Sequence, residues 1–146
     1  MKLTQLQKQK IIKIGKKYNL KLIILHGSYA TDKARPESDL DIGVLGKKLL
    51  DFKTVSSIYS DLSEIFGDNR GRELDLKSLH KIDPLFRYQV AKYSQLLYGD
   101  TIDFNEFRAY AFQQYNDSRD LFELEKKLVI KYQNHLNKKY IKNYVR

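Results

Sequence analysis

Two short apolar segments, separated by a polar stretch, limit the folds open to this chain. Leu22-Ile23-Ile24-Leu25 is a continuous apolar run, which is typical of a buried strand. Residues 39–44 (Asp-Leu-Asp-Ile-Gly-Val) alternate polar and apolar with a period of two, which predicts a half-buried strand. Gly27-Ser28 and a polar stretch broken by Pro36 connect the two. The pattern therefore predicts a sheet at the centre of the fold.

The rest of the chain predicts helices around that sheet. Further strands are expected at 73–76 and 96–98, and helices at 4–18, 51–66, 84–93 and from residue 103 onward. Thr4 is the expected N-cap of the first helix, and Gly15 and Asn19 are expected to weaken or end it. The order predicts an α+β (α/β) fold, a small mixed sheet with flanking helices. Residues 1–100 would form the domain, and residues 101–146 a helical extension that packs on it, on a partner, or on both.

Length and composition exclude several classes of protein. With 146 residues the chain can enclose one modest core, and 42% hydrophobic residues argue against disorder. The absence of cysteine excludes disulfides and thiol catalysis. No apolar run approaches the roughly 18 residues of a membrane span, and the N-terminus lacks a signal-peptide core. A cytoplasmic protein without a membrane partner is expected.

The net charge of +9 is concentrated at the two ends of the chain. Residues 1–21 hold seven lysines and residues 126–146 hold seven basic residues, with no acidic residue in either segment. Between them, 13 basic residues stand against 18 acidic ones. Because the middle of the chain is mildly acidic, a nucleic-acid-binding function is possible but not favoured.

Three aspartates are the candidate catalytic and metal-ligating residues. Asp39 and Asp41 alternate with core residues, so they would project from the same face of one strand. Asp75 lies between Leu74 and Leu76 in the same way. If the two strands pair, three carboxylates meet. Such a group suits Mg²⁺, which prefers oxygen ligands, and phosphoryl transfer assisted by two metal ions.

Gly27 and Ser28 are the candidate nucleotide-binding residues. They follow a strand directly, and a helical turn starting here would leave backbone N–H groups free to meet a phosphate. Glycine lets a phosphate approach the backbone closely, and the serine hydroxyl can donate a hydrogen bond. Together with the aspartates, the two residues indicate a site for a nucleoside triphosphate.

These motifs resemble a known signature. Gly27-Ser28, ten residues, then Asp39-x-Asp41 is similar to the signature of the DNA polymerase β-like nucleotidyltransferase superfamily. The similarity continues through LHGSYA, SDLDIGV, ELDLKSL and DPLFRYQVAKYSQLLYGD. Within the superfamily, the chain resembles the minimal nucleotidyltransferase (MNT) antitoxins of MNT–HEPN toxin–antitoxin pairs.

The resemblance implies an activity. Asp39 and Asp41 would hold two Mg²⁺ ions, and Asp75 would hold one of them and help to deprotonate the acceptor hydroxyl. Gly27 and Ser28 would bind the phosphates of ATP. AMP would pass to a tyrosine hydroxyl on a HEPN-family toxin, a ribonuclease that this modification silences.

Other functions stay open at this point. A nucleotidyltransferase that modifies a small-molecule hydroxyl would use the same residues. A basic nucleic-acid-binding module would carry its acidic residues incidentally, and an inhibitor that acts by binding alone would not need the three aspartates.

Several further residues have a structural interpretation. We expect His26 to pack or hydrogen-bond at a strand end and Arg87 to form a surface ion pair. Lys33 and Arg35 are equally compatible with steering a triphosphate and with a solvated loop. The basic C-terminal segment carries apolar and aromatic anchors that indicate partner docking, second to a plain solvated helix face: Val129, Tyr132, Leu136, Tyr140 and Tyr144.

Overall fold

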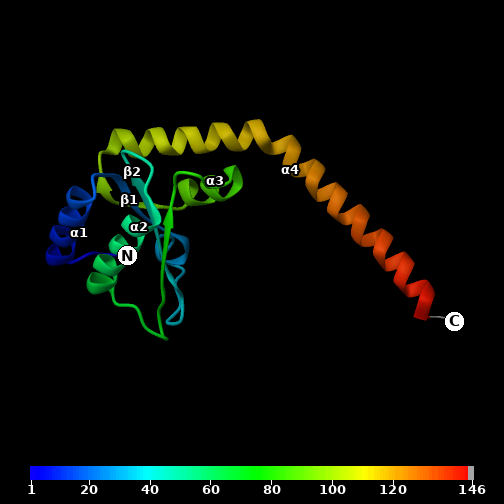
Figure 1. The fold of residues 1–146 in the computed structure, drawn as a ribbon, viewed down its shortest axis with the longest axis horizontal. Coiled ribbons are helices and arrows are strands. Elements are labelled where there is room, and N and C mark those ends of the chain that lie inside the picture. The colour runs from blue at the N-terminus through cyan, green and yellow to red at the C-terminus, as the bar shows by residue number, and fades with distance from the viewer. Residues whose placement is uncertain (145–146) are drawn as a thin grey trace.

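A four-stranded mixed sheet forms the centre of the molecule (Figure 1). The computed structural model describes the backbone of residues 1–144, and the side chains through residue 140. The strand order is β3-β2-β1-β4; β1 is antiparallel to both β2 and β4, and β2 is parallel to β3. The predicted mixed sheet is confirmed, and each strand begins within two residues of its expected start. The strands are β1 (Leu20–His26), β2 (Leu40–Gly46), β3 (Leu74–Ser78) and β4 (Gln95–Gly99).

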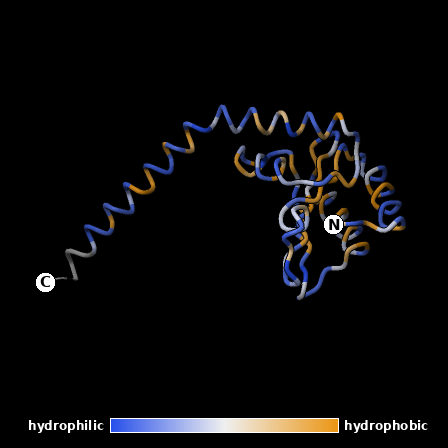
Figure 2. The backbone as a smooth tube through the Cα atoms, turned by 180° about the vertical axis from the view of Figure 1, so that it is seen from behind, coloured by the Kyte–Doolittle hydropathy of each residue, from blue (hydrophilic) through white to orange (hydrophobic). Residues whose placement is uncertain are grey.

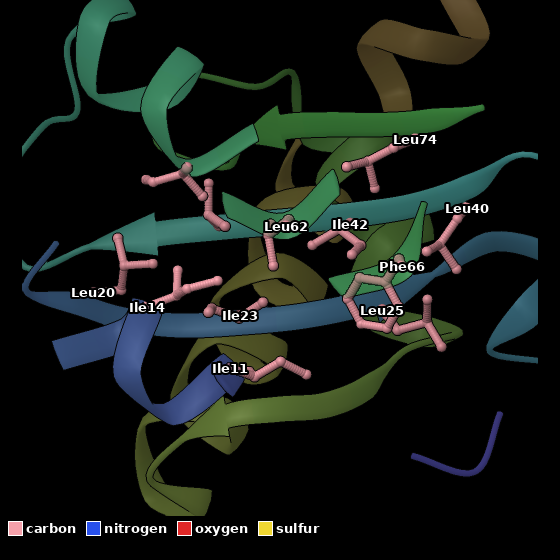
Figure 3. Close-up of a cluster of buried hydrophobic side chains, with 12 residues drawn as sticks. Ile11, Ile14, Leu20, Ile23, Leu25, Leu40, Ile42, Leu62, Phe66 and Leu74 are labelled. Carbon is pink, nitrogen blue, oxygen red and sulfur yellow. The ribbon is translucent and has the colours of Figure 1, made fainter. Parts of the chain in front are cut away.

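Helices cover both faces of the sheet. Helices α1 and α2 enclose one core with inward residues of the strands, shown in Figure 3. Helix α3 and the start of α4 enclose a second, smaller core on the other face. The helices are α1 (Gln5–Lys17), α2 (Phe52–Phe66), α3 (Pro84–Lys92) and α4 (Thr101–Tyr144).

Helix α1 begins where the sequence predicts and runs through Gly15, one of the two residues expected to weaken or end it. Thr4 caps it by accepting a hydrogen bond from the Gln7 backbone N–H, and Asn19 follows its end with a left-handed φ of 49°. Gly15, however, lies inside the helix. A Cβ atom there would collide with the ring of Tyr98, so this glycine admits an aromatic side chain instead of ending the helix.

Helices α2 and α3 begin at aspartate caps that fix the chain entering each helix. Asp51 accepts a hydrogen bond from the Thr54 backbone N–H at 2.7 Å, and Asp83 accepts one from Phe86 N–H at 2.9 Å. Pro84 occupies the first turn of α3, where its missing N–H costs nothing. The cap of α3 thus sets where Phe86 meets the sheet.

Helix α4 changes character along its length. Its first part packs on α3 and the sheet through Phe104, Phe107 and Ala111, and Tyr115 stacks on Tyr88 of α3 with ring centroids 4.2 Å apart. We call residues 116–140 the distal part of α4. Figures 1 and 2 show it projecting beyond α3 and away from the sheet. Within residues 1–144, no helix combines the length and the apolar character that crossing a membrane requires.

Candidate active site

Asp41 and Asp75 lie in one row across the sheet. They are register partners on the parallel strands β2 and β3, and His26 of β1 is the register partner of Asp41 on the other side. Leu40 and Ile42 point into the core beneath α1 and α2, so Asp41 points to the opposite face, which carries α3. The predicted pairing of the two aspartate-bearing strands is confirmed. We call Asp41 and Asp75 the carboxylate row, and His26 lies beside it.

Asp39 approaches the row from the end of the preceding loop. It lies one residue before β2 and is exposed, whereas Asp41 is half-buried. Burial raises the pKa of the Asp41 carboxyl, and the negative charges of Asp75 and Asp39 raise it further. The three carboxylates predicted from the sequence therefore sit close enough to repel one another.

The Gly27-Ser28 turn lies directly against the row. Residues Gly27–Tyr29 form a single 3₁₀ turn, as expected from the sequence. Gly27 has a φ of 70°, and a Cβ atom on it would collide with the Asp41 carboxylate. The Thr31 hydroxyl donates to the carbonyl oxygens of Gly27 (3.3 Å) and Ser28 (3.2 Å), which holds the turn closed. The candidate nucleotide-binding turn and the candidate metal-ligating carboxylates thus meet at Gly27.

A cavity of about 460 Å³ opens between this turn and helix α3. It reaches from Gly27 and Asp41 to the exposed surface of α3. Lys33 lines the cavity and Arg35 does not, which separates two loop cations that the sequence left equivalent. The lining residues are His26, Gly27, Thr31, Lys33, Asp41, Phe86, Gln89, Val90 and Tyr93.

His26 is a buried neutral group beside the carboxylate row. Its side chain packs edge-on against Phe86, with ring centroids 5.9 Å apart, and only 6% of the residue is exposed. Its Nε2 atom has no hydrogen-bond partner in the described structure. Burial, and secondly the positive charge of Lys77, lower its pKa to about 4. The expectation of a packing histidine at a strand end is confirmed.

Lys77 is the residue of the site that the sequence reasoning missed. Its ammonium donates to Asp75 Oδ2 at 2.6 Å and lies 5.3 Å from the centre of the Phe86 ring. The sequence spacing could have indicated this residue, because Lys77 stands two residues after Asp75 on the same strand and therefore on the same face. Only the pairing of β3 with β2 shows that this face carries the site.

The expectation of a surface ion pair at Arg87 is wrong. Arg87 is buried, its guanidinium donates to Gln114 of α4 and to the backbone carbonyl of His80, and it lies 5.3 Å from the Tyr110 ring. The residue ties α3 to α4. The cause is the packing of α4 over α3, which covers a position that the α3 sequence alone would leave exposed.

The donor set suits a divalent cation, although no metal cage is preformed. Within residues 1–144, no three carboxylate or imidazole groups are already close enough to hold an ion together. Magnesium, however, commonly binds through one or two carboxylates plus substrate phosphates. Asp41 and Asp75 are aligned on neighbouring strands, the missing side chain of Gly27 lets the Asp41 carboxylate lie against the turn, and Lys77 already places one cation beside Asp75. The residues present therefore fit Mg²⁺.

Comparison with protein families identifies the fold that carries this site. Residues 9–103 match the family described as polymerase beta nucleotidyltransferase. This segment includes the Gly-Ser turn, all three aspartates and the sheet. The chain belongs to the polymerase β nucleotidyltransferase family. The superfamily resemblance drawn from the motifs is thereby confirmed, and this protein is a nucleotidyltransferase.

Solved structures similar to this nucleotidyltransferase include toxin–antitoxin complexes. One is a toxin–antitoxin with AMP-PNP, with 25% identity, a TM-score of 0.66, and coverage of 85% of this chain and 95% of the other. Another is an MNT antitoxin in complex with tri-AMPylated HEPN toxin from Shewanella oneidensis, with 25% identity, a TM-score of 0.64, and coverage of 88% and 97%. These matches confirm the resemblance to MNT antitoxins.

The same fold occurs in a more distant enzyme. Spectinomycin adenyltransferase AAD(9) from Enterococcus faecialis, with ATP and spectinomycin, matches with 20% identity and a TM-score of 0.52, over 72% of this chain and 59% of the other. At this identity the likeness concerns the fold alone. Among curated proteins, no relative of this nucleotidyltransferase was found.

Proposed function

We propose that this nucleotidyltransferase is an antitoxin that transfers AMP from ATP to a tyrosine hydroxyl of a HEPN-family toxin in the cytoplasm, and so neutralises it. The observation that carries the proposal is the alignment of Asp41 with Asp75 beside the Gly27-Ser28 turn. The similarity to an MNT antitoxin in complex with an AMPylated HEPN toxin supports the choice of acceptor.

Each residue of the site has a role in this reaction. Asp39, Asp41 and Asp75 would hold two Mg²⁺ ions, which when bound neutralise the charge of the triphosphate. Gly27 and Ser28 would bind the ATP phosphates. The hydroxyl oxygen bonds to the α-phosphorus, the bond from that phosphorus to the bridging oxygen breaks, and pyrophosphate leaves. Asp75 would accept the proton of the attacking hydroxyl.

The two parts of the chain would have different roles, one in catalysis and one in binding the partner. Residues 1–100 would form the catalytic domain, and residues 101–146 an extension that packs on it and also reaches the partner. The distal part of α4 supports this, because its large apolar side chains are exposed: Leu121, Leu124, Leu128, Val129, Ile130, Tyr132 and Tyr140. Leu136 is half-buried, and Tyr144 lies outside the described side chains.

Spacing and charge indicate what would cover this surface. Steps of three and four residues carry the face of Phe107 and Ala111, which packs on the body, onward to Leu121, Leu128 and Tyr132. A partner on that face would lie beside α3, on the side of the sheet that carries Asp41. Residues 126–146 have seven basic residues and no acidic one, so the same segment of a second copy would be repelled. We therefore expect the toxin to meet this face with acidic and apolar side chains.

The direct test is AMP transfer to a purified HEPN protein. The nucleotidyltransferase is incubated with its candidate HEPN partner, ATP and Mg²⁺, and the partner is analysed by intact mass and peptide mapping. We expect one or more AMP additions on tyrosine, lost on adding EDTA and in Asp39→Asn. A partner that stays unmodified while Asp39→Asn still neutralises it would contradict the proposal. Labelled AMP on small hydroxyl compounds instead would favour the small-molecule alternative.

A further inference from the structure

Lys77 places a positive charge inside the carboxylate row. Its Nζ atom lies 2.6 Å from Asp75 Oδ2 and 5.3 Å from the centre of the Phe86 ring of α3. Gly43, its register partner on β2, presents no side chain toward it. The ammonium of Lys77 therefore lies between Asp75 of the sheet and Phe86 of helix α3.

The charge of Lys77 also acts on Asp41 and His26. It opposes the rise in the pKa of Asp41 and lowers the pKa of His26, so both groups lie within its electrostatic reach. Asp41 and Asp75 are adjacent carboxylates that repel each other unless a cation lies near them. In the protein without bound metal, Lys77 supplies that positive charge.

We propose that Lys77 is a positioning residue that acts as an internal counter-ion of the carboxylate row and competes with the divalent cation for Asp75. The inference rests on the proposed function, because it takes the row to be the metal site. The ammonium occupies one of the two oxygens of Asp75, and its positive charge opposes a divalent cation at either of them. Metal binding through Asp75 therefore has to overcome the charge of Lys77.

This competition has two opposite consequences. Without metal, Lys77 stabilises the folded protein by offsetting the repulsion between Asp41 and Asp75. With metal, it weakens binding, because its positive charge repels the cation at Asp75. Replacing Lys77 by a neutral side chain should thus lower metal-free stability and raise metal affinity, a combination that general damage to the fold does not produce.

The test measures binding of Mn²⁺ to the nucleotide-free protein by titration calorimetry. Lys77→Met should bind Mn²⁺ roughly fivefold more tightly than the wild type, the upper range for a half-exposed ion pair. Its melting temperature in EDTA should be lower, and its rise on adding Mn²⁺ larger. Lys77→Arg keeps the charge and should behave like the wild type. Lys53→Met, an exposed substitution on α2, is the matched control.

Three outcomes separate the two proposals. Equal or weaker Mn²⁺ binding by Lys77→Met, in a wild type that binds the ion and loses it in Asp75→Asn, overturns the role of Lys77 alone. Absence of Mn²⁺ binding in the wild type and in every variant, with and without a non-hydrolysable ATP analogue, overturns the proposed metal site as well. If the wild type binds Mn²⁺ only together with the analogue, the same comparison of variants is made in its presence. Tighter binding by both Lys77→Met and Lys53→Met would assign the effect to net charge and would also overturn the proposal.

Discussion

The folded body of the molecule and the distal part of α4 use apolar residues for different ends. In the body, Phe107 and Ala111 of α4 are buried against α3 and the sheet. In the distal part, Leu121, Leu128 and Tyr132 follow at helical spacing and are exposed. The same helix thus contributes to the core in one part and leaves large apolar side chains exposed in the other. Helical periodicity shows which residues share a face, but whether that face is buried depends on the elements that pack against it.

The largest expected difference between the two regions concerns catalysis. Asp41→Asn should reduce AMP transfer by more than about a thousandfold, or roughly 4 kcal/mol in the barrier, because it removes a proposed metal ligand from the carboxylate row. The matched change in the distal part, Asp117→Asn, should leave the rate unchanged. Labelled AMP incorporation checks both. Equal losses in the two variants would show that catalysis does not reside in the row.

Stability should divide along the same line. Phe107→Ala removes a buried aromatic side chain and should lower the free energy of unfolding by about 3–5 kcal/mol. Leu128→Ala removes an exposed one and should change it by less than about 0.5 kcal/mol. Urea denaturation of both variants measures the difference. A large effect of Leu128→Ala would mean that the distal part packs on the body or on a second copy.

The pH dependence of stability should come from the body. The pKa of His26 is about 4 in the folded protein, below the ordinary value of 6.5, so only the unfolded chain takes up this proton between those values. Stability should therefore fall as the pH drops from 6.5 to 4, by about 3 kcal/mol from this group. Denaturation in EDTA across this range should show a shallower slope for His26→Phe. The exposed His135→Gln should keep the wild-type slope.

The smallest expected effect on stability belongs to the distal lysines. The combined change of Lys127, Lys131 and Lys138 to glutamine should alter the free energy of unfolding by less than about 0.5 kcal/mol, because these side chains are exposed. The same variant should bind an acidic HEPN partner more weakly, and its binding should depend less on salt. Unchanged affinity and salt dependence would remove the charge argument for the partner surface.

The sequence alone was enough to predict the elements and which candidate site residues the fold brings together. Alternation around Asp39, Asp41 and Asp75 predicted two strands with carboxylates on one face, and β2 and β3 confirm the pairing. Gly27 and Ser28 were predicted at a turn, and they form one. These features could be found because strand periodicity and turn chemistry are local, acting within a few residues of each position.

Tertiary structure decided what depends on residues distant in the chain. Tyr98 packs so closely against Gly15 that no side chain fits there, and Arg87 is buried because α4 covers α3. Lys77 joins the site only because β3 pairs with β2. The sequence by itself determined which side chains share a face; the packing of the elements determined which faces meet. Burial, partners and charge environment depend on contacts between distant segments, which local periodicity does not encode.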